Sequence, residues 1–78
     1  MTTVRFFAAA RAATGTSEIS RDFASLNELI DHCSSLNEVL ATLLPTCTFL
    51  VDGISESDHS RSLTDVSEVD VLPKFAGG

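Results

Sequence analysis

The chain has 78 residues and a net charge of −6, with 44% apolar and 21% charged residues. This length supports one hydrophobic core, and the composition is that of a globular chain rather than a disordered one. The five basic residues are scattered along the chain: Arg5, Arg11, Arg21, Arg61 and Lys74. Nucleic-acid binding requires clustered cations, so this class is excluded. The acidic balance favours a protein partner with a basic docking surface.

Cysteine usage and hydropathy exclude several further classes. Cys33 and Cys47 are the only cysteines, too few for a four-ligand zinc site, and they form no Cys-x-x-Cys motif. Both lie beside apolar residues, so we expect buried, free thiols. Arg11 interrupts the one apolar run near the start, and no segment is long enough to span a membrane. The sequence predicts no metal site, no membrane partner and a cytoplasmic location with reduced thiols.

Alternation of residue type predicts a first strand over residues 2–9. Val4 and Phe6 fall on one face of this strand, and Phe7 falls on the other. A Thr-Gly-Thr turn follows. The short polar segment 17–22 then predicts an edge strand, whose charges discourage aggregation.

The apolar period then changes to that of a helix. Ser25 and Glu28 have the spacing of a capping box, in which Ser25 caps the helix. An apolar stripe follows with helical spacing: Leu26, Leu29, Ile30 and Cys33. The same Ser-Leu-Asn-Glu pattern returns at residues 35–38 and starts a second stripe, which Pro45 ends: Leu36, Val39, Leu40 and Leu43. We expect one helix followed by a second, short one.

The last third of the chain predicts two strands. Residues 47–51 are rich in β-forming types and end at an Asp-Gly turn, and a polar loop is expected over 55–62. Residues 67–72 form the last strand, which Pro73 ends. One helical block between a hairpin and later strands predicts an α+β fold, with one mixed sheet covered on one face by a helix.

The chain ends in Gly77-Gly78, half of its four glycines. Glycine has no side chain to obstruct a narrow channel, and a free carboxylate would follow it. We therefore expect a domain over residues 1–73 and an extended, flexible tail over residues 74–78, which reaches roughly 17 Å. A frayed end without a function is the alternative interpretation.

Three groups of residues carry a resemblance to a known family. They are Phe6-Phe7-Ala8 with Arg11 and Gly15; Leu63-Thr64-Asp65 with Glu68-Val69; and Pro73 with Gly77-Gly78. Together they resemble the small subunit of molybdopterin synthase, a MoaD-like sulfur carrier of the MoaD/ThiS family. The resemblance implies the ubiquitin-like β-grasp fold. Two departures concern the family's usual Gly-Asp turn, replaced by Val66-Ser67, and its usual second proline, replaced by Lys74.

The resemblance also implies a function. A MoeB-like enzyme would use ATP to adenylate Gly78, and a sulfur donor would then convert the adenylate into a thiocarboxylate. A MoaE-like large subunit would admit the tail, formed by Lys74, Phe75, Ala76 and Gly77. Sulfur would pass to cyclic pyranopterin monophosphate within a heterotetramer. The chain would be a non-catalytic subunit without a permanently bound cofactor.

Two residues of the domain are candidates for the partner interface. Strand parity puts Phe7 and Leu72 on the face opposite the apolar one, where exposed apolar side chains mark a docking surface. Phe75 would anchor the tail in a groove of the partner. Two alternatives share the tail chemistry: a sulfur carrier for thiazole (thiamine) or cysteine synthesis, and a ubiquitin-like protein modifier. A plain interaction domain is a third.

Overall fold

Strands with alternating apolar residues form one sheet at the centre of the fold. The computed structural model describes residues 1–74. The strands are β1 (Thr2–Phe6), β2 (Glu18–Arg21), β3 (Thr48–Val51), β4 (Ile54–Glu56) and β5 (Glu68–Leu72). Their order in the sheet is β2-β1-β5-β3-β4. Strands β1 and β5 are parallel and the other neighbours are antiparallel, which confirms the mixed sheet.

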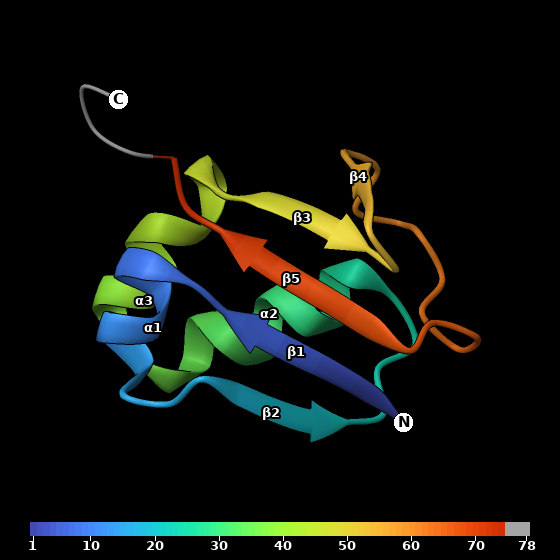
Figure 1. The fold of residues 1–78 in the computed structure, drawn as a ribbon, viewed down its shortest axis with the longest axis horizontal. Helices are drawn as coiled ribbons and strands as arrows, with labels where there is room; N and C mark the ends of the chain where they lie inside the picture. Colours follow the sequence, from blue (N-terminus) through green and yellow to red (C-terminus); the bar gives the residue numbers. More distant parts are fainter. Residues whose placement is uncertain (75–78) are drawn as a thin grey trace.

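Helices cover one face of this sheet. They are α1 (Ala8–Thr14), α2 (Leu26–Leu36) and α3 (Glu38–Leu43), followed by a 3-10 turn (Leu44–Thr46). Figure 1 shows α2 behind the sheet, α1 and α3 at the end of the sheet where β1 and β5 finish, and β5 in the middle of the sheet. A mixed sheet of this strand order with helix α2 packed across it is the ubiquitin-like β-grasp fold. The fold class expected from the sequence is therefore confirmed.

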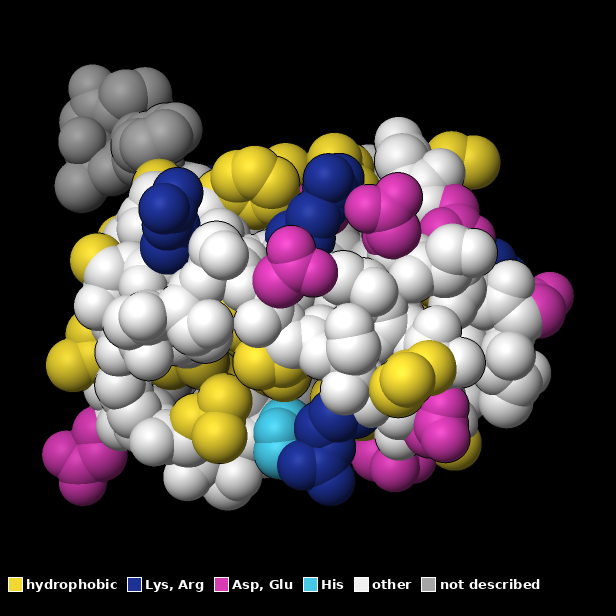
Figure 2. Space-filling view, turned by 60° about the horizontal axis from the view of Figure 1, so that its bottom comes forward, with side chains coloured by type: hydrophobic (Ala, Val, Ile, Leu, Met, Phe, Trp, Pro, Cys, Tyr) yellow, Lys and Arg dark blue, Asp and Glu magenta, His cyan; other side chains and the backbone are white. Residues whose placement is uncertain are grey.

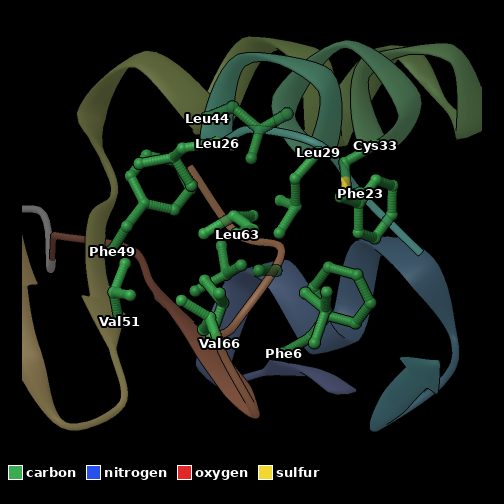
Figure 3. Close-up of a cluster of buried hydrophobic side chains, with 14 of the residues drawn as sticks. Phe6, Phe23, Leu26, Leu29, Cys33, Leu44, Phe49, Val51, Leu63 and Val66 are labelled. Atoms are coloured by element: carbon green, nitrogen blue, oxygen red, sulfur yellow. The ribbon is translucent and has the colours of Figure 1, made fainter. Parts of the chain in front are cut away.

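The core lies between the sheet and the helices. The sheet contributes Val4, Phe6, Phe49, Val51, Val69 and Val71, and the helical layer contributes Ala10, Leu26, Leu29, Cys33, Leu40 and Leu44. Phe23, Leu63 and Val66 close the core from the loops. Figure 3 shows these side chains converging from both layers and from the segment before β5. Removing this apolar surface from water is the main source of stability for so small a domain.

The strand predicted over residues 2–9 is wrong at its end. Strand β1 stops at Phe6, and Ala8 begins helix α1, which ends at Gly15 in the left-handed conformation (φ 72°). Alanine has the strongest helix propensity, and a run of small apolar residues fits the period of a strand as well as that of a helix. The turn expected around Gly15 is confirmed, but the chain has a second helical region that the sequence did not predict.

The first predicted helix is confirmed, including its cap. The backbone N–H of Glu28 donates to Ser25 Oγ (3.2 Å), although the Glu28 carboxylate accepts from the N–H of Ala24 rather than from that of Ser25. The second pattern is wrong in register. Asn37, not Ser35, caps α3, because its Oδ1 accepts from the N–H of Leu40 (2.8 Å).

The break at Asn37 also changes which residues of the second stripe are buried. Helix α2 continues to Leu36, and α3 starts with a new phase after the extended Asn37. Leu36 and Val39 are therefore 47% and 61% exposed. Leu40 and Leu44 are the residues of this region that enter the core.

The segment expected to be a polar loop over 55–62 begins as a strand instead. Asp52 and Gly53 adopt positive φ angles (47° and 84°) and form the predicted turn, which returns Ile54–Glu56 to pair with β3. The Asp52 carboxylate accepts hydrogen bonds from the N–H groups of Ser67 (3.1 Å) and Glu68 (2.9 Å). This carboxylate thus holds the turn into β5, at the place where the sequence has Val66-Ser67.

Candidate functional site

The central strand of the sheet leads directly to the predicted reactive tail. Strand β5 ends at Leu72, Pro73 is buried, and Lys74 is exposed. In Figure 1 this exit lies at the opposite end of the sheet from the N-terminus. Phe75, Ala76, Gly77 and Gly78 lie outside the described residues, so their predicted roles stay predictions. The domain boundary at residue 73 also stays a prediction.

The face of the sheet opposite the helices carries a charged cluster at its centre. In the register of the strands, Arg5 of β1 lies beside Asp70 of β5, which lies beside Leu50 of β3. Arg5 donates from Nε to Asp70 Oδ1 (2.7 Å) and from Nη2 to Asp70 Oδ2 (3.0 Å). Glu68 Oε2 lies 3.4 Å from the same Nε. This two-pronged geometry fixes the plane of the guanidinium.

The charged cluster also contacts the predicted interface. The guanidinium carbon of Arg5 lies 5.8 Å from the centre of the Phe7 ring, within the range of a cation–π contact. The hydrogen bond to Asp70, with smaller contributions from the charges of Asp70 and Glu68, raises the pKa of Arg5 above its ordinary value. Arg5 is therefore a fixed positive charge between an acidic pair and an aromatic ring.

The two residues predicted for the partner interface lie near the exit of β5. Phe7 is not in a strand but immediately precedes helix α1, and its side chain is 38% exposed. Its backbone N–H donates to the carbonyl of Val71 (3.2 Å), which holds Phe7 beside the end of β5. Leu72 is half-buried. The structure places both residues at the exit of β5, and their role in docking stays a prediction.

Both thiols are shielded from chemistry. Cys33 is fully buried, and burial raises its pKa to about 11. Cys47 is half-buried, its thiol donates to the carbonyl of Leu43 (3.3 Å), and burial also raises its pKa. The expectation of buried, free thiols is confirmed for Cys33 and holds in part for Cys47. A protonated thiol is a poor nucleophile.

The described surface has several hollows, of about 680, 390 and 210 Å³. A hollow of about 210 Å³ lies between the end of the helical layer and β4, and its walls include Cys47, Glu56, His59 and Lys74. Over residues 1–74, no three residues of the metal-binding types come together. Figure 2 shows acidic and basic side chains interspersed on the face it presents. No helix of the described part is long and apolar enough to cross a bilayer.

The sequence comparisons and the structure comparison give different results. No protein-family model matches the chain, and no curated protein sequence matches it significantly. Solved structures do match. Small archaeal modifier protein 1 (SAMP1) from Methanosarcina acetivorans has a TM-score of 0.84 and 19% identity, over 99% of this chain and 95% of that one.

Two further matches are molybdopterin converting factors. A putative molybdopterin converting factor, subunit 1, from Pyrococcus furiosus has a TM-score of 0.81 and 20% identity, over 95% and 97% of the two chains. The other is a complex of subunits 1 and 2 of molybdopterin-converting factor from Helicobacter pylori. Its matching chain has a TM-score of 0.71 and 22% identity, over 99% and 97%. At these identities the matches establish the fold.

Sequence reasoning did not find the pairing of Arg5 with Asp70. Alternation placed both residues on the outward face, but they are 65 positions apart. Their contact depends on the parallel pairing of β1 with β5, in which Arg5 and Asp70 are direct partners. The only available signal was the presence of opposite charges on the outward faces of two strands.

Proposed function

We propose that this chain is the small subunit of a molybdopterin synthase, a sulfur carrier that holds sulfur as a thiocarboxylate on Gly78. The observation that carries this proposal is the sheet order, in which the central β5 ends at Leu72 and the chain continues through Pro73 into a segment with Gly77-Gly78. The similarity of the fold to a putative molybdopterin converting factor, subunit 1, supports it.

The chemistry follows from the weakness of a carboxylate as a sulfur acceptor. A MoeB-like partner transfers AMP from ATP to the Gly78 carboxylate and releases pyrophosphate, which creates a good leaving group. The persulfide of a sulfur donor then displaces AMP and forms an acyl disulfide with Gly78. A second thiol cleaves this bond, which releases the thiocarboxylate and leaves the donor sulfur and the second thiol joined as a disulfide. Water must be excluded during this step because it would hydrolyse the adenylate. Glycine allows the backbone to approach closely within a narrow channel.

The partner supplies the catalytic groups. A MoaE-like large subunit receives Lys74, Phe75, Ala76 and Gly77 in its channel and transfers the sulfur to cyclic pyranopterin monophosphate, in an assembly of two small and two large subunits. The matched Helicobacter pylori chain comes from a complex of subunits 1 and 2, which supports a large-subunit partner. Phe7 and Leu72, near the exit of β5, contribute the apolar part of the docking surface. No cofactor is bound permanently, and the complex works in the cytoplasm.

Intact mass spectrometry tests the carrier chemistry. The chain is incubated with an adenylating enzyme, ATP and a sulfide source, and a thiol alkylator then labels any thiocarboxylate, under conditions calibrated on the two cysteines. We expect a gain of about 16 Da, which Met1 oxidation can also produce, together with an alkylation that methionine sulfoxide cannot undergo. Deleting Gly78 should abolish both. Unmodified chain after demonstrated adenylation would contradict the proposal.

A matched pair of variants tests the docking surface. Phe7→Ser should weaken binding of the large subunit at least about tenfold, because exposed aromatic residues anchor interfaces. Leu36→Ser removes a comparably exposed apolar side chain from the helical layer and should leave binding unchanged. Equal affinities for the two variants, measured by titration calorimetry, would place the interface elsewhere.

A protein modifier is the second candidate function, and the similarity to SAMP1 favours it. In this case the Gly78 acyl group passes to a lysine of a target protein. Conjugates of higher mass that survive thiols on a denaturing gel, and that disappear when Gly78 is deleted, would identify it. Carriers for thiazole or cysteine synthesis share the mass gain, but they would not restore synthase activity with a large subunit.

A further inference from the structure

Phe7 combines a fixed backbone with an exposed side chain. Its N–H donates to the carbonyl of Val71 (3.2 Å), and its carbonyl accepts from the N–H of Ala10 (3.1 Å), so β5 and α1 hold the backbone from both sides. Neither bond restrains the side-chain torsions of this residue, which is 38% exposed. An exposed aromatic side chain loses rotamer freedom when it docks, and this loss weakens binding. A restraint on the free ring therefore strengthens docking.

The side chain of Arg5 supplies such a restraint. Its guanidinium carbon lies over the ring of Phe7, 5.8 Å from the ring centre, where a cation is attracted to the face of an aromatic ring. Phe7 keeps an extended backbone (φ −123°, ψ 154°), although β1 ends at Phe6. Residues two positions apart in an extended segment point to the same face. The local backbone thus brings the cation and the ring together on the open face of the sheet.

Asp70 fixes the guanidinium that lies over the ring. Two hydrogen bonds, from Nε to Oδ1 (2.7 Å) and from Nη2 to Oδ2 (3.0 Å), hold the plane of the guanidinium. The Asp70 side chain is only 13% exposed, whereas that of Arg5 is 43% exposed. The parallel pairing of β1 with β5 places the two residues directly opposite each other (Figure 1). The contacts therefore run outward from a shielded carboxylate, through Arg5, to the exposed ring.

We propose that Arg5 is a positioning residue, which Asp70 holds in place and which fixes the Phe7 ring for docking on the large subunit. The inference rests on the proposed function, in which Phe7 is part of the docking surface. Glu68 Oε2, 3.4 Å from Arg5 Nε, adds a second anion beside the guanidinium. Arg5 acts before the complex forms, because it reduces the number of orientations that the free ring adopts.

Nuclear magnetic resonance of the free, full-length chain tests the positioning step without a partner. The ring current shifts protons above the face of a ring upfield, and a fixed side chain gives the χ1 couplings of a single rotamer. We expect upfield Arg5 Nε and Cδ protons and single-rotamer Phe7 couplings in the wild type. Arg5→Gln and Asp70→Asn should each average these couplings over several rotamers. Arg21→Gln, which removes an exposed arginine from β2, is the control and should leave them unchanged.

A double-mutant cycle tests the next step, docking on a MoaE-like large subunit. Arg5→Gln should weaken binding about two- to fivefold, the size of an exposed cation–π contact. Phe7→Leu keeps an apolar side chain but removes the aromatic face, and in this background Arg5→Gln should have no further effect. Arg21→Gln makes the same change in net charge and should bind like the wild type. Titration calorimetry measures the affinities, under conditions in which denaturant unfolding shows every variant to be folded.

Arg5→Lys separates the fixed plane from the charge. Lysine keeps the positive charge, but its compact ammonium group cannot form the two-pronged bond to Asp70. We expect averaged Phe7 couplings and weakened binding, as for Arg5→Gln. Restoration of both to wild-type values would overturn the proposal, since the charge alone would then be enough.

Two further results would overturn the proposal. One is a set of Phe7 couplings that is the same in Arg5→Gln as in the wild type. The other is an equal loss of affinity for Arg5→Gln with and without the Phe7 ring, which would mean that Arg5 itself contacts the partner. If the wild-type chain does not bind the large subunit, the proposed function fails and the docking role fails with it. The couplings in the free chain still decide whether Arg5 fixes the ring.

Discussion

The two faces of the sheet are made by alternate residues of the same strands, yet they differ in burial and in charge. On the covered face, Val4, Val69 and Val71 are fully buried against the helices. On the open face, Arg5, Glu68 and Asp70 form a charged cluster beside Phe7. Stability comes from the first face, and the second is free to carry recognition. The following predictions test this division, from the largest expected effect to the smallest.

Truncation of a core leucine should have the largest effect. Leu29 is fully buried, and Leu29→Ala should lower the free energy of unfolding by about 2–5 kcal/mol, because it leaves a cavity. Leu50→Ala, the matched change on the open face, should cost about 1 kcal/mol or less, since Leu50 is already half-exposed. Denaturant unfolding measures both. Similar losses would mean that the open face also contributes to the core.

The buried thiol of Cys33 should make the covered face sensitive to alkaline pH. Burial raises its pKa from the ordinary value of 9.0, which we take for the unfolded chain, to about 11 in the folded chain. Between about pH 9 and pH 11 the unfolded chain has lost a proton that the folded chain retains, so stability falls as the pH rises. We expect a loss of roughly 2 kcal/mol by pH 11 and no contribution from this thiol below pH 8.

A substitution tests this pH effect. Cys33→Ala removes the titrating group and should flatten the decline in unfolding free energy between pH 9 and pH 11, whatever its effect on stability at pH 7. A decline as steep as that of the wild type would show that other groups cause it.

The caps of the helical layer should have intermediate effects. Asn37 accepts from the N–H of Leu40 and donates to the carbonyl of Ala13, so it links α3 to α1. Asn37→Ala should cost about 1–2 kcal/mol. Ser35→Ala should cost less than about 0.5 kcal/mol, because Ser35 is exposed and caps no helix. A larger loss of stability for Ser35→Ala than for Asn37→Ala in thermal unfolding would place the cap at Ser35, as the sequence pattern predicted.

The charged cluster of the open face should have the smallest effect. Asp70→Asn removes the negative partner of Arg5, and we expect a loss of stability smaller than that of Asn37→Ala. Added salt should reduce the loss in part, because it screens the half-exposed Arg5, whereas the Asp70 side chain is only 13% exposed. Asp65→Asn, a change of charge at an exposed position outside the cluster, is the control. Salt-independent destabilisation by Asp70→Asn would indicate a packing role instead.

Much of the fold could be predicted because its strongest signals are local. The Ser25 cap, the stripe that begins at Leu26 and the Asp52-Gly53 turn each depend on residues a few positions apart. The errors occurred where local signals are ambiguous. The alanines after Phe7 fit two periods, and β4 is a three-residue edge strand in which only Ile54 is apolar.

The candidate site likewise combines features that the sequence shows with contacts that form only in the folded chain. The sequence alone supplied the Gly77-Gly78 pair and the choice of Phe7 and Leu72 as interface candidates. It could not show that Arg5 binds Asp70, because this contact depends on packing between distant segments.

By itself, the sequence determined the class of fold, since hydrophobic period and turn chemistry act over short distances and need no partner segment. Tertiary structure alone decided the parallel pairing of β1 with β5. It also decided the use of Asp52 to hold the turn into β5. The physical reason is that these contacts join residues far apart in the chain, so they exist only once the sheet and its helical layer are assembled.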